Sequence, residues 1–209
     1  MKAQKISAAL FDMDGTVFDT EAIYRRAWLA AGIPEALYRT YIGSPRQRIR
    51  EIFTANNFDP DYIFSFKDEY VKKELEKAIP LKPGAEECLR WLKENGYRTA
   101  IATSSSLNTA LGYLERSGLN TYFDAVVSGN QVENGKPAPD IFLKAAAELK
   151  KDPSECIVLE DSKNGVRAGR SAGMTTIMIP DLVPADDEMR EKADAIFKTL
   201  FELPDFLSR

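Results

Sequence analysis

The chain has 209 residues, 44% of them hydrophobic and 29% charged, which describes a globular protein with one large domain or a core domain and a small insertion. The net charge of −4 excludes the basic footprint of a general nucleic-acid binder, and no apolar run is long enough to span a membrane. Histidine is absent, which excludes Ser-His-Asp and Cys-His catalysis and zinc sites built on histidine.

The first predicted element is a short buried strand over residues 8–11 that ends at two carboxylates. Asp12 and Asp14 follow it one residue apart, and Gly15 turns the backbone directly after them. Open α/β sheets form their sites at the carboxyl ends of strands. Acids there can bind a hard cation through oxygen, and one can act as a nucleophile by forming an aspartyl-phosphate. The alternative is an ordinary loop, because Asp and Gly both favour turns.

Between this motif and Pro83 we find no convincing strand but three helical stretches, at residues 21–31, 45–56 and 60–78. Aromatic and aliphatic side chains recur in them at helical spacing, which is typical of a helical core. We therefore predict a small all-helical cap domain over residues 18–82, inserted after the first strand of an α/β core formed by residues 1–17 and 83–209. Its two crossings to the core would serve as hinges, so the domain could close over a site and exclude water.

From about residue 80 onward, short apolar strands alternate with helical segments. The predicted strands cover residues 99–102, 123–127, 156–159, 175–179 and 195–197, the last at an edge. The predicted helices cover residues 85–93, 107–117, 139–149 and 165–172. This alternation implies right-handed crossovers and an α/β fold with a Rossmann-like parallel sheet flanked by helices on both faces.

Two observations predict a cytoplasmic location. Residues 1–5 lack the apolar segment of a signal peptide. Cys88 and Cys156 are too few for a disulfide framework and lie in apolar surroundings, so we expect buried thiols in a reducing compartment.

Polar residues follow three further strands of the predicted sheet. Thr103-Ser104-Ser105 follow the second strand, Lys136 lies in the loop after the third, and Glu160-Asp161 end the fourth. Each set has a structural alternative, because Thr and Ser cap helices, a lysine beside prolines can form an exposed turn, and acids favour helix starts. All of them fall at one edge of a parallel sheet, which favours a shared site. Without histidine, acid–base chemistry there must use other groups, and a metal would be oxygen-ligated, which points to magnesium.

In order and spacing, these four motifs resemble those of the haloacid dehalogenase superfamily. The resemblance is to the branch with a small helical cap after the first motif, which includes beta-phosphoglucomutases and many small-molecule phosphatases. It implies that Asp12 is the nucleophile that attacks phosphorus and that Asp14 is the general acid/base. It also implies that Thr103 donates a hydrogen bond to the transferring phosphoryl group and that Lys136 neutralises its charge.

The resemblance further implies a magnesium cofactor. Its implied ligands are Asp12, the backbone carbonyl of Asp14 and Asp161, with Glu160 close by. The phosphate would contact Gly15, Ser104 and Ser105. Backbone N–H groups of residues 13–16 would also help to bind it. A carboxylate approaches an anionic phosphate only when cations cancel the repulsion, and magnesium together with Lys136 would supply them.

The helical domain should select the substrate. Residues 43–48 resemble the loop in which the mutases place an arginine on the distal phosphate, so Arg46 is a candidate substrate contact and Lys72 a second. The alternative is that Arg46, Arg48 and Arg50 form one solvated helix face.

Two features of the sequence differ from the mutase pattern and argue against mutase activity. Tyr24 stands where the mutases typically carry a histidine, and residues 103–107 lack the lysine and asparagine of the mutase loop. Asp14 itself favours phosphate chemistry over dehalogenation of carbon. We therefore expect a magnesium-dependent, monomeric phosphatase that acts on a small phosphorylated metabolite, for example a sugar phosphate, and binds neither nucleic acid nor a membrane. A beta-phosphoglucomutase-like mutase and a non-catalytic phospho-ligand binding protein are the alternatives.

Overall fold

The computed structural model describes residues 5–42, 44 and 46–208. Its contacts divide the chain into two compact units, Met1–Asp19 with Pro80–Arg209 and Thr20–Ile79. The predicted insert, 18–82, extends slightly beyond the second unit at both ends. The reason is that the two connecting segments pair with each other: the Asp19 amide donates to the Pro80 carbonyl and the Lys82 amide to the Val17 carbonyl, each at 2.9 Å.

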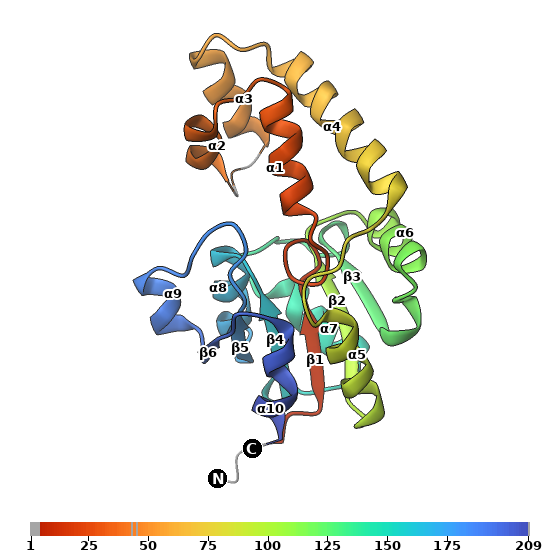
Figure 1. Cartoon of the computed structure of the whole chain (residues 1–209). Coiled ribbons are helices and arrows are strands. Elements are labelled where there is room, and N and C mark those ends of the chain that lie inside the picture. Colours follow the sequence, from red (N-terminus) through yellow and green to blue (C-terminus); the bar gives the residue numbers. More distant parts are fainter. Residues whose placement is uncertain (1–4, 43, 45, 209) are drawn as a thin grey trace. The chain divides into compact units, whose positions relative to one another are not determined.

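The core unit contains a six-stranded parallel sheet in the order β3-β2-β1-β4-β5-β6 (Figure 1). Its strands are β1 (Ala8–Phe11), β2 (Arg98–Thr103), β3 (Ala125–Ser128), β4 (Cys156–Glu160), β5 (Thr175–Met178) and β6 (Ala195–Ile196). Every pairing along this order is parallel, which confirms the predicted Rossmann-like α/β fold. The strand order reverses between β1 and β4, and ligands of such sheets bind outside the carboxyl ends at that switch point.

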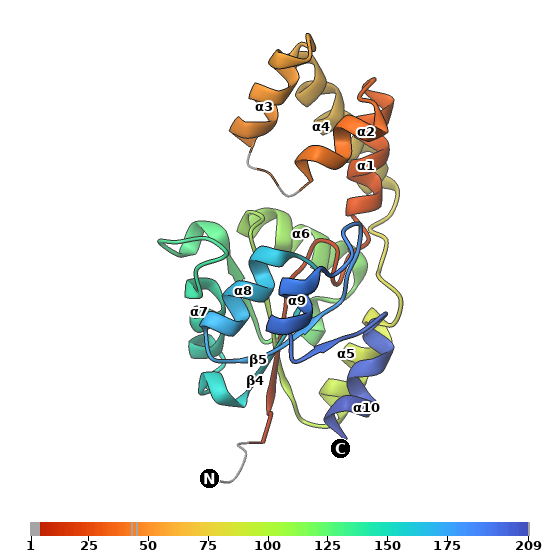
Figure 2. The same cartoon turned by 90° about the vertical axis from the view of Figure 1, so that its left-hand side faces the viewer.

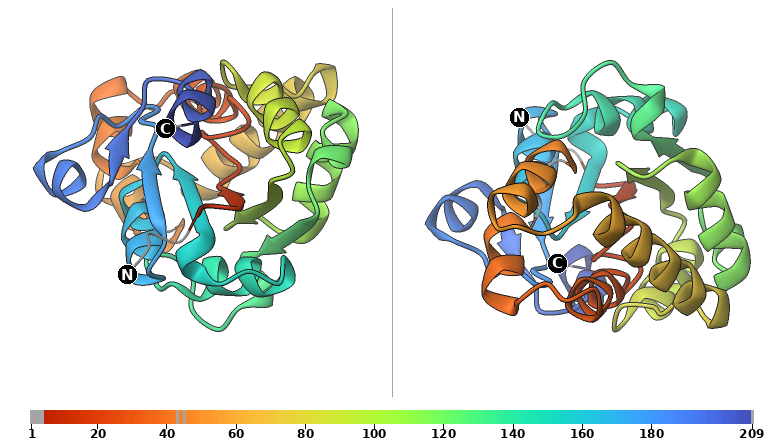
Figure 3. Two further views of the ribbon diagram at one scale, coloured as in Figure 1. Left: turned by 90° about the horizontal axis from the view of Figure 1, so that it is seen from below. Right: turned by 90° about the horizontal axis from the view of Figure 1, so that it is seen from above.

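Helices cover both faces of the sheet. Helices α7 (Asp140–Glu148) and α8 (Lys163–Ser171) lie on one face, and α5 (Ala85–Glu94) and α10 (Leu203–Leu207) lie on the other (Figure 2). Figure 3 shows the strands between these layers when the sheet is viewed end on. On the α7 and α8 face, the fully buried core includes Leu10, Val158 and Phe142. Removal of such apolar side chains from water is the main force that holds the layers together.

The remaining helices of the core unit are α6 (Leu107–Ser117) and α9 (Asp187–Lys192), with 3-10 turns at Asn120–Tyr122, Gly129–Gln131, Pro153–Glu155 and Leu200–Glu202. Helix α8 begins two residues before its predicted start because Ser162 is its N-cap. The Ser162 hydroxyl accepts a hydrogen bond from the Gly165 amide at 3.1 Å, which satisfies one free donor of the first turn.

Both cysteines are buried and unpaired, as predicted. Burial raises the pKa of the Cys88 thiol to about 12 and that of the Cys156 thiol to about 11. Both side chains therefore stay protonated and act as small apolar groups. None of the described helices combines the length and the apolarity that a membrane span requires.

The second unit is entirely helical over its described residues: α1 (Glu21–Ala30), α2 (Glu35–Tyr41), α3 (Arg46–Ala55) and α4 (Pro60–Lys77). The prediction of three helices was wrong, because α2 was missed. That helix is only seven residues long, and Pro34 directly before it reads as a break although proline also precedes helix starts. The predicted start of the next helix at Pro45 lies outside the described residues.

An aromatic cluster forms the core of this unit. The Trp28 ring contacts Tyr41, Phe53 and Phe64 edge-on at centroid distances of 5.6–5.8 Å. The Tyr41 hydroxyl is buried within this apolar cluster and has no hydrogen-bond partner among the described residues. Burial raises the pKa of Tyr41, so the hydroxyl stays neutral. A buried hydroxyl without a partner lowers stability because it loses its hydrogen bond to water.

Tyr41→Phe should therefore raise the free energy of unfolding by about 1 kcal/mol, since it removes the unpaired hydroxyl and keeps the ring. Urea titration followed by circular dichroism measures the change. Tyr38→Phe, the same substitution in the same helix, is the matched control and should give no gain. A destabilised Tyr41→Phe variant would mean that the hydroxyl does have a partner.

Candidate active site

Asp12 is the first residue after β1, and its backbone amide donates to the Leu159 carbonyl of β4 at 2.9 Å. The chain is therefore still held in the sheet where the carboxylate leaves it. The Asp12 residue is only 7% exposed. A carboxylate this deeply buried needs a positively charged partner, because burial alone disfavours its ionised form.

That partner is Lys136, from the loop after β3, whose side chain is 5% exposed. Its ammonium donates to Asp12 Oδ1 at 2.5 Å, to Glu160 Oε1 at 2.8 Å and to the Ala102 carbonyl at 3.0 Å. An ammonium has three N–H donors, so all three are used. One side chain thus connects the ends of β1, β2 and β4, and the predicted exposed-turn alternative for Lys136 is wrong.

The charges at this site are not in balance. Burial raises the pKa of Asp12 to about 7, against the opposing effect of Lys136, and Glu160 adds to the rise. Burial also acts to lower the pKa of Lys136, but the Asp12 and Glu160 carboxylates outweigh it and hold that pKa above its usual value. Lys136 is therefore charged, and one ammonium faces two buried carboxylates. A further cation beside Asp12 would favour its ionised form.

The donor set fits a hard divalent cation. Asp12, Glu160 and Asp161 each place a carboxylate oxygen within 4.8 Å of the others. Both Glu160 oxygens already accept hydrogen bonds, one from Lys136 and the other from the Ser162 amide at 2.6 Å. Asp12 and Asp161 are the candidate direct ligands, with Glu160 beside them. Carboxylate oxygens are the ligands that magnesium prefers.

The Asp14 carboxylate is not part of this cluster of Asp12, Glu160 and Asp161. It accepts a hydrogen bond from the Ser105 hydroxyl at 2.8 Å. The Ser105 amide in turn donates to the Thr103 hydroxyl at 3.0 Å, which leaves the proton of that buried hydroxyl available for donation. Ser104 is exposed at the same strand end. Ser105, assigned to the substrate from the sequence, thus contacts and orients the candidate acid/base.

Gly15 makes room for the candidate metal ligands. Its φ of +85° is a conformation that side chains disfavour, and a Cβ placed there would lie 2.5 Å from Asp161 Oδ2. Its amide donates to the Phe18 carbonyl at 2.8 Å within the same loop. Because that amide is engaged, the geometry does not support the predicted contact between Gly15 and phosphate.

Gly165, on α8, makes room for Glu160. A Cβ at Gly165 would lie 1.7 Å from Glu160 Oε1. Sequence reasoning missed this residue, since a glycine inside a helix has no obvious signal unless the neighbouring strand end is considered. It also missed Asp181, although an acid soon after a buried strand was the signal that identified Asp12.

The predicted substrate residues of the helical unit lie on its surface. The Arg46 side chain is 60% exposed, and its guanidinium lies 4.0 Å above the Phe64 ring and 3.6 Å from Asp68. Arg48 and Arg50 form exposed ion pairs with Glu51 and Asp61, as the helix-face alternative predicts for those two. Lys72 is exposed.

Lys67 is a further cation of the helical unit that the sequence did not indicate. Its side chain is 13% exposed, and its ammonium lies 5.4 Å from the centroids of both the Tyr24 and Trp28 rings. It also pairs with Asp68. Tyr24, which the sequence predicts to stand where the mutases carry a histidine, thus lies within cation–π distance of a lysine.

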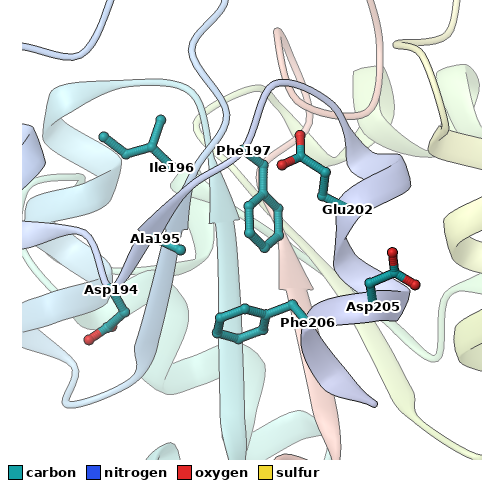
Figure 4. A pocket seen from close by; sticks show the side chains of 7 residues that line it. All are labelled: Asp194, Ala195, Ile196, Phe197, Glu202, Asp205 and Phe206. Atoms are coloured by element: carbon teal, nitrogen blue, oxygen red, sulfur yellow. The ribbon is translucent and has the colours of Figure 1, made fainter. Parts of the chain in front are cut away.

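A pocket of about 520 Å³ lies between β6 and α10 (Figure 4). Phe197 and Phe206 line it together with the acidic side chains of Asp194, Glu202 and Asp205. None of the strand-end residues described above lines this pocket. Its ionisable lining residues are all acids and offer no positive charge to a phosphate, so we do not place the chemistry there.

Comparison with known proteins agrees with this geometry. A family model described as haloacid dehalogenase-like hydrolase matches residues 6–173. The "Phosphorylated carbohydrates phosphatase" of Thermotoga maritima is 37% identical over 181 residues, which cover 82% of this chain and 84% of that protein. The "Fructose-1-phosphate phosphatase YqaB" of Escherichia coli is 34% identical over 184 residues, covering 83% and 96%. A solved Thermotoga maritima structure, provisionally named a beta-phosphoglucomutase, matches with a TM-score of 0.83 and 31% identity, covering 97% and 99%.

The packing of Gly165 against Glu160 predicts a stability effect. Gly165→Ala should lower the free energy of unfolding by about 1–3 kcal/mol, because the added methyl group displaces a carboxylate that is buried and paired with Lys136. Gly112 is the matched control: it also lies in a helix, but a Cβ there meets nothing within 4 Å. Gly112→Ala should raise stability by about 0.5–1 kcal/mol. Equal effects of the two substitutions in denaturant titrations would contradict the close approach.

Proposed function

The chain belongs to the haloacid dehalogenase-like hydrolases, and from that premise we propose that it is a magnesium-dependent phosphatase that hydrolyses a small phosphorylated metabolite through an aspartyl-phosphate on Asp12. The observation that carries the proposal is the buried group of Asp12, Lys136 and Glu160, with Asp161 beside it, at the switch point of the sheet. A purely structural role does not explain why more carboxylates than ammonium groups are buried here. Buried negative charge that is not fully compensated is costly to stability.

Each residue has a defined part in the proposed reaction. An Asp12 oxygen attacks phosphorus, a P–O bond to Asp12 forms, and the bond to the leaving alcohol oxygen breaks. Asp14, held by Ser105, gives its proton to that oxygen and then takes a proton from the water that attacks the aspartyl-phosphate. Inorganic phosphate leaves and Asp12 is regenerated.

Charge compensation is the other requirement. Lys136 touches Asp12 directly, so its ammonium is positioned to offset the negative charge of an incoming phosphoryl group. The Thr103 hydroxyl has its proton free to donate to a phosphoryl oxygen. Magnesium, held by Asp12 and Asp161 with the Asp14 backbone carbonyl, would supply further charge neutralisation when bound.

The names of the relatives favour phosphorylated carbohydrates as the substrate class. Arg46 is the proposed contact for the distal part of such a substrate, since its guanidinium is exposed and held in place by Phe64 and Asp68. We also propose that the helical unit acts as the cap that excludes water from the reaction. The net charge of −4 and the two buried thiols are consistent with a cytoplasmic enzyme that binds no nucleic acid.

A second candidate function is a phosphosugar mutase. It is favoured by the likeness to the Thermotoga maritima structure provisionally named a beta-phosphoglucomutase. Against it stand Tyr24, which replaces the expected histidine, and the serine-rich segment after β2, which lacks the mutase lysine and asparagine. Conversion of β-glucose 1-phosphate that requires a bisphosphate primer, without release of phosphate, would favour the mutase.

The central test is release of phosphate from p-nitrophenyl phosphate and from a panel of sugar phosphates in the presence of magnesium. Asp12→Asn should reduce turnover by roughly a thousandfold or more, because it removes the nucleophile and keeps the shape. Asp205→Asn, an exposed acid of the pocket beside α10, is the control and should turn over as the unchanged protein does. Turnover that survives Asp12→Asn would rule out the aspartyl-phosphate.

A further inference from the structure

Asp181 is a buried acid that the proposed reaction does not use. It follows β5 after Ile179 and Pro180, and its side chain is only 9% exposed. Its Oδ1 accepts a hydrogen bond from the Lys82 ammonium at 2.7 Å. Its Oδ2 is buried and has no hydrogen-bond partner among the residues that the structure describes. A buried carboxylate oxygen without a donor is costly, so this atom requires an explanation.

The free oxygen lies beside the candidate metal ligands. A Cβ at Gly15 would lie 2.5 Å from Asp161 Oδ2 and 3.3 Å from Asp181 Oδ2, so both carboxylates border the same side of the Gly15 backbone. The sheet explains this proximity, because β4 and β5 are neighbours and the Ile179 amide donates to the Glu160 carbonyl at 2.7 Å. Asp161 and Asp181 thus leave adjacent strand ends.

Lys82 accounts for only part of the charge on Asp181. Its ammonium also lies 3.6 Å from Asp19, so one cation is shared between two carboxylates. The ammonium contacts Oδ1 and leaves Oδ2, which borders Gly15 on the same side as the Asp161 carboxylate. Two carboxylates at close range repel each other unless a donor or a cation lies between them.

We propose that Asp181 is a positioning residue for the divalent cation: its Oδ2 accepts a hydrogen bond from a water molecule bound to the cation that Asp12 and Asp161 hold. The inference rests on the proposed function, since it requires that cation. Groups of this kind fix the arrangement around a metal without touching it, and their loss typically weakens metal binding by about 10–100-fold. Gly15 is then required because a side chain there would fill the space between the two carboxylates.

The competing explanation is purely structural. Lys82 belongs to the segment that pairs with residues 17–19, so its ion pair with Asp181 could do no more than fasten that segment to the sheet. The two explanations predict different effects of the Asp181 and Lys82 substitutions on metal affinity. If the pair is structural, loss of either partner has the same effect. If Asp181 supports the cation, loss of the Asp181 charge weakens metal binding, whereas loss of Lys82 leaves a more negative carboxylate beside the site.

The test is calorimetric titration of the metal-free full-length protein with magnesium chloride, which needs no turnover. Asp181→Asn should raise the dissociation constant about 10–100-fold. Lys82→Met should leave it unchanged or lower it. Asp205→Asn is the control for loss of one negative charge at an exposed residue that is not among the candidate metal ligands. Thermal unfolding in a chelator reports whether each variant is folded. If Asp181→Asn does not fold, Asp181→Glu keeps the charge, displaces the oxygen by one methylene group and should also weaken binding.

Equal affinity of the unchanged protein and Asp181→Asn would overturn the inference. A parallel loss of affinity in Asp181→Asn and Lys82→Met, in step with their loss of thermal stability, would overturn it in favour of the structural pair. These results differ from failure of the proposed function, in which the unchanged protein itself would bind no magnesium.

Discussion

A single buried ammonium, that of Lys136, connects the carboxyl ends of three neighbouring strands of this sheet. It contacts two carboxylates and a backbone carbonyl from three strand ends, and its side chain is 5% exposed. Removing charges from water costs several kcal/mol per ion, so an arrangement of this kind persists only when partners are close and fully used. Lys136 satisfies that condition with all three of its donors. The position of Asp12, and with it the proposed nucleophile, depends on this contact.

The crowding of carboxylates at this sheet edge also explains the two glycines beside the site. Carboxylates can gather at one sheet edge only if the backbone leaves room for them, and Gly15 and Gly165 provide that room beside Asp161 and Glu160. The remaining excess of negative charge then favours a bound cation, and magnesium suits an all-oxygen donor set. Stability and the proposed chemistry are therefore opposed here: the buried negative charge lowers stability, and the proposed reaction uses it.

Much of this organisation could be predicted from the sequence. Acids directly after apolar strands identified Asp12 and Glu160-Asp161, because a parallel sheet brings its strand ends to one edge. Alternation of strands and helices predicted the parallel sheet, which the structure confirms. What sequence could not give is side-chain direction: Ser105 faces Asp14, the Gly15 amide faces its own loop, and Lys136 reaches past β2 to Asp12. Helix α2 was missed because seven residues carry too little periodicity to outweigh a preceding proline.

The most direct test of the role of Lys136 is the free energy of unfolding of Lys136→Met in metal-free buffer. Because the substitution leaves Asp12 and Glu160 buried without their cation, we expect a loss of about 3–5 kcal/mol. The double variant Asp12→Asn with Lys136→Met should recover a substantial part of that loss, since it removes one of the two buried acidic groups left without a cation. A loss below about 1 kcal/mol for Lys136→Met, as is typical of an exposed ion pair, would contradict the claim that this ammonium stabilises the site.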